Sequence, residues 1–396
     1  MYNYLIFGLI FLIPAIGIIG GLSLAATIPI FLIIILFSIR DKITFQFFIN
    51  YKLELLFTSW CFISCSYAIN PINSLLTFLQ VFSVLFLGFI VNNHLNKSIF
   101  YNNQTIKCYL ISGFLLAIIL FFIEYLTNGL ITKFFRAIFQ PSSTQSFNLF
   151  MLDRGCALLA ITAWVIIAIL ISYRKTFISL LFYASVLYLL FISDSLASFL
   201  GFLVGGLTFL ISKIIKKIFF RLITISLIAG SLSIPMIMSN INPQYISEKY
   251  STAIQDSAKH RLFIWHFVAD KIVEKPIFGY GFASSKYIEV KDNEIIKYNN
   301  MAWHPLPLHP HNNILQIILE TGLIGFLLFL ALVYKYLKQI NNLPINYRSI
   351  SYACFINYYI IGMISYSIWQ VWWVAVSIWV LILMKLLVKP DIIIDN

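Results

Sequence analysis

The chain has 396 residues, of which 60% are hydrophobic and 11% are charged. Soluble domains carry about 25% charged residues, so this composition excludes a water-soluble globular protein. The 37 Phe and 22 Tyr residues, together with so few charges, also exclude a disordered chain. The sequence therefore predicts an all-α polytopic membrane protein.

Apolar runs of spanning length follow one another along the chain. The first 39 residues hold no charged side chain and are broken at Gly20-Gly21, which favours two retained spans over a cleavable signal with its basic start. At roughly 20 apolar residues per span, the sequence predicts about 12 transmembrane helices. Their expected ranges are 4–19, 22–39, 53–69, 74–92, 107–126, 150–172, 177–193, 196–212, 218–237, 312–334, 349–368 and 370–388.

Residues 1–396 are thus expected to form a single integral-membrane domain. Residues 238–311 form a large loop between the ninth and tenth spans, and we expect this loop to contain short helices. A loop of this length without structure of its own is unusual in a compact protein, and such loops tend to be functional.

Basic residues gather in every second connection between the spans, as expected for cytoplasmic connections. These residues are Arg40, Lys42, Lys52, Lys97, Lys107, Arg174, Lys175, Lys213, Lys216, Lys217, Arg221, Lys335, Lys338, Arg348, Lys385 and Lys389. The opposite short connections hold Lys133, Arg136 and Arg154. The asymmetry predicts cytoplasmic termini and a 238–311 loop on the outer face. The net charge of +12 comes from these basic residues in the cytoplasmic connections and therefore reflects membrane topology. We expect no nucleic-acid partner.

The outer loop holds most of the histidines and one amphipathic segment. The histidines within it, five of the chain's six, are His260, His266, His304, His309 and His311. Residues 261–274 carry apolar side chains at helical spacing. This pattern predicts a helix that lies flat at the outer membrane face, with its apolar side toward lipid or the bundle.

Ionisable residues near the spans gather at the outer third of the predicted bundle. Those residues are Glu124, Asp153, Arg154, Asp194 and Glu320, whereas Glu54 lies toward the inside. Charged groups inside a bilayer are costly and mark functional sites. A transporter places its charges near the midplane more often, so this distribution favours a site that opens outward.

His311-Asn312 falls at the expected N-terminus of the tenth span. Unpaired N–H groups and the positive end of the helix dipole attract anions there. An imidazole at that place is expected to have a lowered pKa and to stay neutral, as a general base requires. Two other interpretations stay open: a metal site formed with His304 and His309, or a simple helix cap.

The candidate arginines also have simpler interpretations. Arg154 is placed to pair with Asp153 or Glu124, and Arg261 is placed to anchor to lipid head groups. Arginine is nevertheless the side chain best suited to a diphosphate, because it stays charged and binds phosphate in bidentate fashion.

A motif around the tenth span resembles that of the bacterial O-antigen ligases. His311-Asn312, then nine residues, then Gly322-Leu323-Ile324-Gly325 match the pattern H-[NSQ]-x9-G-x-x-[GTY]. Glycines three apart also let a neighbouring helix approach closely.

A second stretch, further upstream, resembles the wider superfamily of O-antigen ligases, Wzy-type polymerases and protein O-oligosaccharyltransferases. It consists of Arg261, Trp265, then Glu274-Lys275-Pro276 and Gly279-Tyr280-Gly281. The two resemblances together cover about 260–325.

The resemblance implies a metal-independent enzyme without a cofactor, similar to C-type glycosyltransferases. Such enzymes take a glycan from undecaprenyl diphosphate at the periplasmic face of the bacterial inner membrane and pass it to a hydroxyl, which for ligases belongs to lipid A–core. The family's essential histidine aligns with His311 and its loop arginine with Arg261. A second arginine, at the outer start of a middle span, aligns by position with Arg154. Asn312, His309 and the motif glycines are then supporting residues.

This chain departs from the family in one place. Many members carry an Arg where a later span opens, whereas this chain reads Ser193-Asp194-Ser195-Leu196-Ala197-Ser198. A ligase is our first hypothesis, and a Wzy-type polymerase is the second. A protein O-oligosaccharyltransferase is less expected because the sequence carries no soluble extension after the twelfth span. A lipid or solute transporter is the alternative outside the enzymes.

Overall fold

The computed structural model describes residues 2–39, 47–95, 104–139, 146–250, 256–298 and 301–387. Its α-helices are α1 (Tyr2–Gly20), α2 (Leu24–Ile39), α3 (Phe47–Asn50), α4 (Lys52–Cys65), α5 (Pro71–His94), α6 (Gln104–Leu126), α7 (Leu130–Phe139), α8 (Asp153–Ser172), α9 (Thr176–Ile192), α10 (Leu196–Ile214), α11 (Phe219–Asn240), α12 (Pro243–Lys249), α13 (Asp256–Glu274), α14 (Asn313–Asn341), α15 (Ile345–Ile364) and α16 (Val371–Leu387). The basic residues Arg40, Lys42, Lys97 and Lys389 lie outside the described residues.

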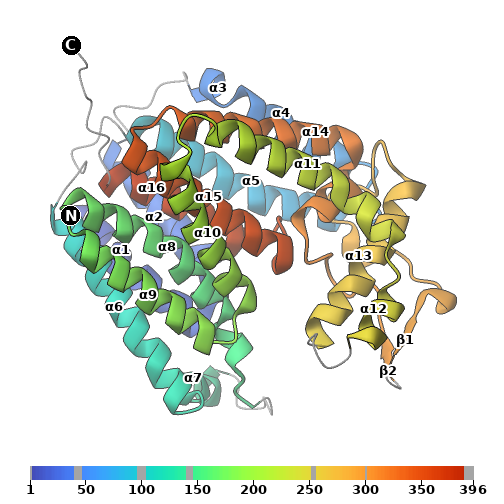
Figure 1. Ribbon diagram of the computed structural model, residues 1–396, viewed down its shortest axis with the longest axis horizontal. Helices are drawn as coiled ribbons and strands as arrows, with labels where there is room; N and C mark the ends of the chain where they lie inside the picture. Colours follow the sequence, from blue (N-terminus) through green and yellow to red (C-terminus); the bar gives the residue numbers. More distant parts are fainter. Residues whose placement is uncertain are drawn as a thin grey trace.

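The molecule is a helical bundle with a small helical and hairpin unit at one end (Figure 1). Each expected apolar run coincides with a helix, because a chain in lipid must satisfy its backbone hydrogen bonds internally. Among the described residues, seven helical segments are long and apolar enough to cross a membrane, with α1 and α2 counted as one. The all-α polytopic fold is thereby confirmed, and the number of twelve crossings stays a prediction.

Helix α8 forms the centre of the bundle. Its residues from Gly155 to Ile169 are all buried, and α1, α9, α10, α15 and α16 pack around it. Glycines permit the closest approaches, since a Cβ on Gly205 of α10 would lie 2.9 Å from the Ala353 carbonyl oxygen of α15. This central helix begins at Asp153-Arg154 and therefore fixes both side chains relative to the bundle.

Helix α14 is not the continuous span that the sequence predicts. Gly322 has φ 63° and ψ −169°, so two helical segments meet there at a kink. The Trp60 indole of α4 donates to the Thr321 carbonyl at 2.9 Å, and the Leu323 N–H donates to the Pro276 carbonyl at 2.9 Å. The backbone groups that the kink frees are thus bonded to neighbouring elements.

The end of the bundle that carries residues 241–312 is called the loop face. It contains α12, α13, the short 3₁₀ turns η5 (Ser285–Tyr287) and η6 (Asp292–Glu294), and an antiparallel hairpin of β1 (Ile296–Tyr298) and β2 (Met301–Trp303) in which Ile296 pairs with Trp303. Our sequence interpretation did not predict this hairpin.

Helix α13 begins at Asp256 rather than at Arg261, and its apolar side lies against the bundle, which is one of the two expected orientations. Phe263, Ile264, Phe267 and Val268 are buried where α13 contacts α11 and α14. The apolar side of α13 therefore packs on the protein.

Candidate functional site

His311 lies just before α14, with its backbone in the left-handed region at φ 52°. Its Nδ1 atom lies 2.6 Å from the Ser365 carbonyl oxygen. A carbonyl only accepts hydrogen bonds, so Nδ1 carries the proton and Nε2 keeps a lone pair. The ring is therefore held in the tautomer that leaves Nε2 free to accept a proton.

The surroundings of His311 disfavour its protonated form. Burial, together with the neighbouring His309, Arg261 and His260, lowers the pKa of His311 to about 4, against the hydrogen bond to Ser365, which raises it. Desolvation and nearby positive charge both penalise an imidazolium. His311 is consequently neutral at ordinary pH.

His309 is the closest histidine neighbour of His311. Their ring centroids are 4.2 Å apart, and His309 Nε2 lies 3.4 Å from the same Ser365 carbonyl. His304 instead accepts from the Leu306 N–H through Nδ1 at 3.2 Å. In the part of the chain that the structure describes, no three His, Cys, Asp or Glu side chains are grouped to hold a metal ion.

Asn312, and not His311, caps α14. Its side-chain oxygen accepts from the N–H groups of Ile314 and Leu315, both at 3.1 Å. These two donors are among the N–H groups at the helix N-terminus that the sequence analysis expected to attract an anion. Because the cap occupies them, fewer N–H groups at the N-terminus of α14 remain for an anion.

Arg261 and Arg154 supply positive groups on two different elements of the loop face. Arg261 projects from α13 and Arg154 from the first turn of α8. Both Nε atoms are buried and have no hydrogen-bond partner among the described residues. Burial lowers the pKa of Arg261, while Asp153 and Tyr366 raise it, so these groups lie within electrostatic reach of one another.

The simpler interpretation of Arg154 as the partner of Glu124 is wrong. Glu124 accepts from the Ile131 and Thr132 N–H groups at 2.6 and 3.1 Å, so it caps α7. Asp153 also leaves Oδ1 buried without a partner. Among the described residues, neither arginine forms an ion pair closer than 4.0 Å.

Trp265 fixes Arg261 relative to His311, which our sequence interpretation did not foresee. Its indole N–H donates to the Pro310 carbonyl at 2.9 Å. Residues four apart share one helix face, so Trp265 and Arg261 both point toward the histidine segment. The spacing of Arg261 and Trp265 was the only signal in the sequence.

Glu320 has a structural role and is not one of a set of solvent-accessible ionisable residues. It is fully buried and accepts from the Ala283 N–H at 3.0 Å and the Ser285 N–H at 3.1 Å, and also from the Trp369 indole. Gln316, one turn earlier, accepts from the Ile368 N–H at 3.3 Å. The two side chains thereby hold the 365–370 segment that presents the Ser365 carbonyl to His311.

The motif glycines let the loop and α14 touch through their backbones. Gly279 and Gly281 have φ values of 72° and 93°, and the Tyr280 and Gly281 N–H groups donate to the Leu319 and Glu320 carbonyls at 2.8 and 2.9 Å. A Cβ on Gly322 would lie 2.1 Å from the Ile277 carbonyl oxygen. Gly322 thus serves a loop contact instead of the predicted helix contact.

Replacement of Gly279 by alanine should destabilise the fold. A Cβ there would lie 2.7 Å from backbone atoms of Leu319, Glu320 and Gly322, and the left-handed backbone alone costs about 1–2 kcal/mol with a side chain. We expect Gly279→Ala to lower the midpoint of thermal unfolding in detergent. Gly230→Ala is the control, because nothing lies within 4 Å of that Cβ; equal midpoints would contradict the packing argument.

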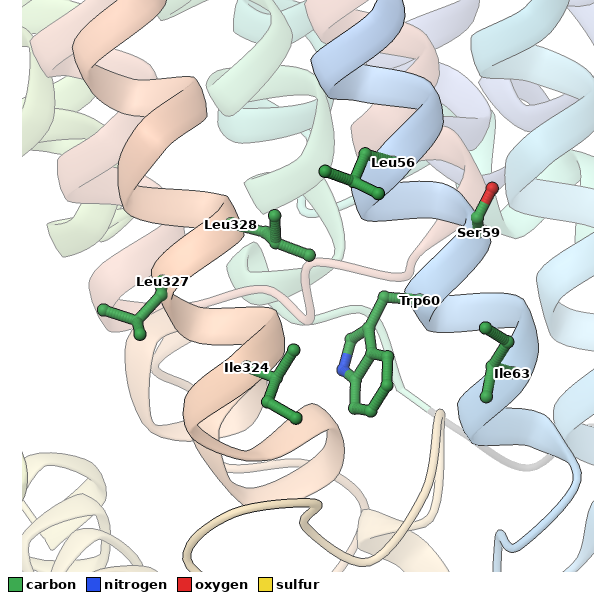
Figure 2. A pocket seen from close by; sticks show the side chains of 7 residues that line it. All are labelled: Leu56, Ser59, Trp60, Ile63, Ile324, Leu327 and Leu328. Atoms are coloured by element: carbon green, nitrogen blue, oxygen red, sulfur yellow. The ribbon is translucent and has the colours of Figure 1, made fainter.

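Gly325 does face another helix, and an apolar groove opens beside it between α4 and α14 (Figure 2). A Cβ on Gly325 would lie 3.0 Å from the Trp60 ring. The groove has a volume of about 480 Å³. Its lining residues are Leu56, Ser59, Trp60, Ile63, Ile324, Leu327 and Leu328. It carries almost no polar surface, and neither His311 nor a candidate arginine lines it.

Glu54, at the other end of α4, is not an open proton or ion site. It pairs with Lys335 at 2.6 Å and accepts from the Tyr336 hydroxyl at 2.8 Å. A transport path needs ionisable groups that are exposed to a passage. The pairing of Glu54 therefore gives the transporter hypothesis no support.

The fold is that of a multi-pass membrane protein. Its candidate site contains the neutral His311 and the two arginines Arg261 and Arg154. Residues 180–330 match the model of the O-antigen ligase family. Over the full length of both chains, the protein is 58% identical to proteins of Rickettsia felis and Rickettsia conorii and 56% identical to one of Rickettsia prowazekii, each named "Putative polysaccharide ligase". The chain belongs to the O-antigen ligase family.

Proposed function

We propose that the protein is an O-antigen ligase of the bacterial inner membrane. It transfers a glycan from undecaprenyl diphosphate to lipid A–core at the periplasmic face. Its family and the names of its relatives support a ligase that acts on polysaccharide. The concentration of basic residues in the opposite connections supports the orientation of the loop face toward the periplasm.

The observation that carries this proposal is the hydrogen bond between His311 Nδ1 and the Ser365 carbonyl. In the proposed reaction, an acceptor hydroxyl oxygen forms a bond to the anomeric carbon of the donor. The bond from that carbon to the diphosphate breaks, and the diphosphate leaves with the electron pair. The hydroxyl proton passes to His311 Nε2, whose lone pair the Ser365 contact keeps free.

The arginines stabilise the leaving diphosphate in this mechanism. Arg261 and Arg154 approach from α13 and α8, and both have unpartnered Nε atoms. Fixed positive groups act most strongly where charge develops in a site shielded from water. Because the Asn312 cap occupies two N–H groups of α14, the arginines provide most of this stabilisation.

A complementation experiment tests the function. We expect the gene, expressed in a bacterial strain that lacks its own O-antigen ligase, to restore long-chain lipopolysaccharide on gels. Purified protein should move the glycan from the lipid diphosphate to lipid A–core. Growth of the lipid-linked glycan instead would indicate a Wzy-type polymerase, and activity in neither assay would refute the proposal.

The pH dependence of transfer should reflect the unusual histidine. Because the pKa of His311 is about 4, kcat/KM should stay flat on acidification until pH approaches about 4 and then fall. Bound diphosphate brings negative charge, which favours the imidazolium and raises the pKa. The acid limb of kcat, which reports the loaded enzyme, should therefore lie at higher pH than that of kcat/KM. The reverse order would contradict His311 as the base.

A further inference from the structure

Helix α7 is an amphipathic helix that the bundle leaves uncovered. None of its ten residues is buried. It follows α6 and precedes the segment that leads into α8, and both Gln104–Leu126 and Leu149–Ser172 are apolar enough to cross a membrane. Figure 1 shows α7 at the end of α6, projecting from the bundle. It therefore lies at the level where two spans emerge.

The side chains of α7 separate into two arcs around the helix. At 3.6 residues per turn, Thr132, Lys133 and Arg136 share one arc. The other arc carries the apolar side chains Leu130, Ile131, Phe134, Phe135, Ala137, Ile138 and Phe139. Phe134 is 62% exposed and Phe139 is 74% exposed. Aromatic side chains this exposed on a fixed element indicate a surface that something apolar covers.

The bundle holds α7 in this orientation. Glu124, fully buried at the end of α6, accepts from the Ile131 N–H at 2.6 Å and from the Thr132 hydroxyl at 2.6 Å. A carboxylate at a helix N-terminus also stabilises the helix dipole. Phe147 packs on Gly129 in the turn before α7, where a Cβ would lie 2.2 Å from the Phe147 ring. The exposed apolar arc therefore belongs to an anchored element.

We propose that α7 docks on the anionic lipid surface of the membrane at the loop face. Its apolar arc lies among the upper acyl chains, and Lys133 lies among lipid phosphates. A short helix with aromatic residues on one side and basic residues on the other is the pattern of an interfacial helix. Charge complementarity selects this occupant, because the polar arc carries Lys133 and Arg136 and no acidic residue.

This assignment accounts for the basic residues that the topology pattern left over. Lys133 and Arg136 lie on α7, whereas Arg154 belongs to the candidate site. Arg136 also reaches the Met151 sulfur at 3.1 Å, just before α8 begins. A helix fixed at the lipid surface thus holds the start of α8, and with it Arg154, at a constant depth. The proposal requires a membrane-spanning chain and does not depend on the transfer reaction.

Spin labels on the full-length protein test the docking. The exposed Cys108 is first replaced by Ser, and nitroxides are attached in separate Phe134→Cys and Lys133→Cys variants. The proteins are reconstituted into vesicles of phosphatidylcholine and phosphatidylglycerol in equal parts. We expect the label at 134 to be relaxed by oxygen and protected from a water-soluble nickel chelate. The neighbouring label at 133 should show the reverse.

A third variant and a lipid measurement complete the test. Phe135→Cys, also on the apolar arc, should behave like Phe134→Cys and guards against failure of one variant to fold. Lys133→Gln should reduce the retention of spin-labelled phosphatidylglycerol at the protein without changing that of phosphatidylcholine. Equal chelate access at 133 and 134, unchanged phosphatidylglycerol retention, or spin–spin broadening from a second copy at 134 would each overturn the proposal.

Discussion

His311→Ala should leave the protein folded and reduce glycan transfer by roughly 10²–10⁴-fold, the contribution of a positioned general base. The expected loss is large because the Ser365 carbonyl binds Nδ1 and leaves the lone pair of Nε2 free to accept a proton. The fold should persist because the segment stays tied through the Asn312 cap and the Trp265 bond to Pro310. Purified protein, assayed with the lipid-linked donor and lipid A–core, gives the rate.

Two further variants separate catalysis from structure. His311→Asn retains a side-chain N–H for the Ser365 carbonyl but offers no basic nitrogen, so it should be as inactive as alanine. His266→Ala is the matched control, because His266 also bonds a backbone carbonyl, Met238, at 2.8 Å but lies outside the site. An active His311→Asn protein would remove His311 from proton transfer and leave it a structural role.

Several features of the site follow from local sequence and were therefore predictable. Helices are local structures, so long apolar runs indicate the bundle directly. The run of prolines before His311, and an asparagine three residues before Leu315, mark the start of α14. Composition and spacing thus indicate the helical fold and the approximate position of the polar loop.

The features that escaped prediction depend on contacts between distant segments. The carbonyl that orients His311 belongs to Ser365, 54 residues away, and a backbone carbonyl leaves no mark on the sequence. From the sequence, Glu320 is an ionisable residue within a span. Its structural role depends on hydrogen bonds from Ser285 and Trp369, which lie 35 and 49 residues away. Gly322 fits a helix-packing pattern as well as it fits a kink, so only the approach of Ile277 decides between them.

The structure shows the turn at Ser193-Asp194-Ser195, where many family members carry an arginine and this chain does not. Ser193 and Ser195 are buried, and Ser195 donates to Ser198 at 2.9 Å within the start of α10. Asp194 has φ 56° and is exposed. Because this turn has no arginine, Arg261 and Arg154 provide most of the positive charge that stabilises the diphosphate in the proposed mechanism.

Loss of Arg261 should therefore be the second severe change. Removal of one fixed donor from a charge-stabilising site costs about 10²–10³-fold in rate, and we expect Arg261→Gln to lower kcat/KM by that order. Arg261→Lys should recover only part of the activity, because an ammonium group cannot bind phosphate oxygens in bidentate fashion. Transfer rates of the three purified proteins give the comparison.

The control for Arg261 is Arg221→Gln. Arg221 is exposed in the first turn of α11, at the opposite end of that helix from the loop face, so its loss should leave transfer unchanged. Thermal unfolding of Arg261→Gln should match that of the unaltered protein, since the Trp265 contact with Pro310 remains. A drop in stability as large as the drop in rate would assign Arg261 to the fold.

Arg261→Gln also carries a signature that a structural defect would not produce. The charge of Arg261 is one of the causes that lower the pKa of His311. Its removal should let that pKa rise, because a nearby positive charge disfavours the imidazolium. The acid limb of kcat/KM should then move to higher pH in Arg261→Gln and stay in place in Arg221→Gln. An unmoved limb would mean that Arg261 and His311 do not act in one site.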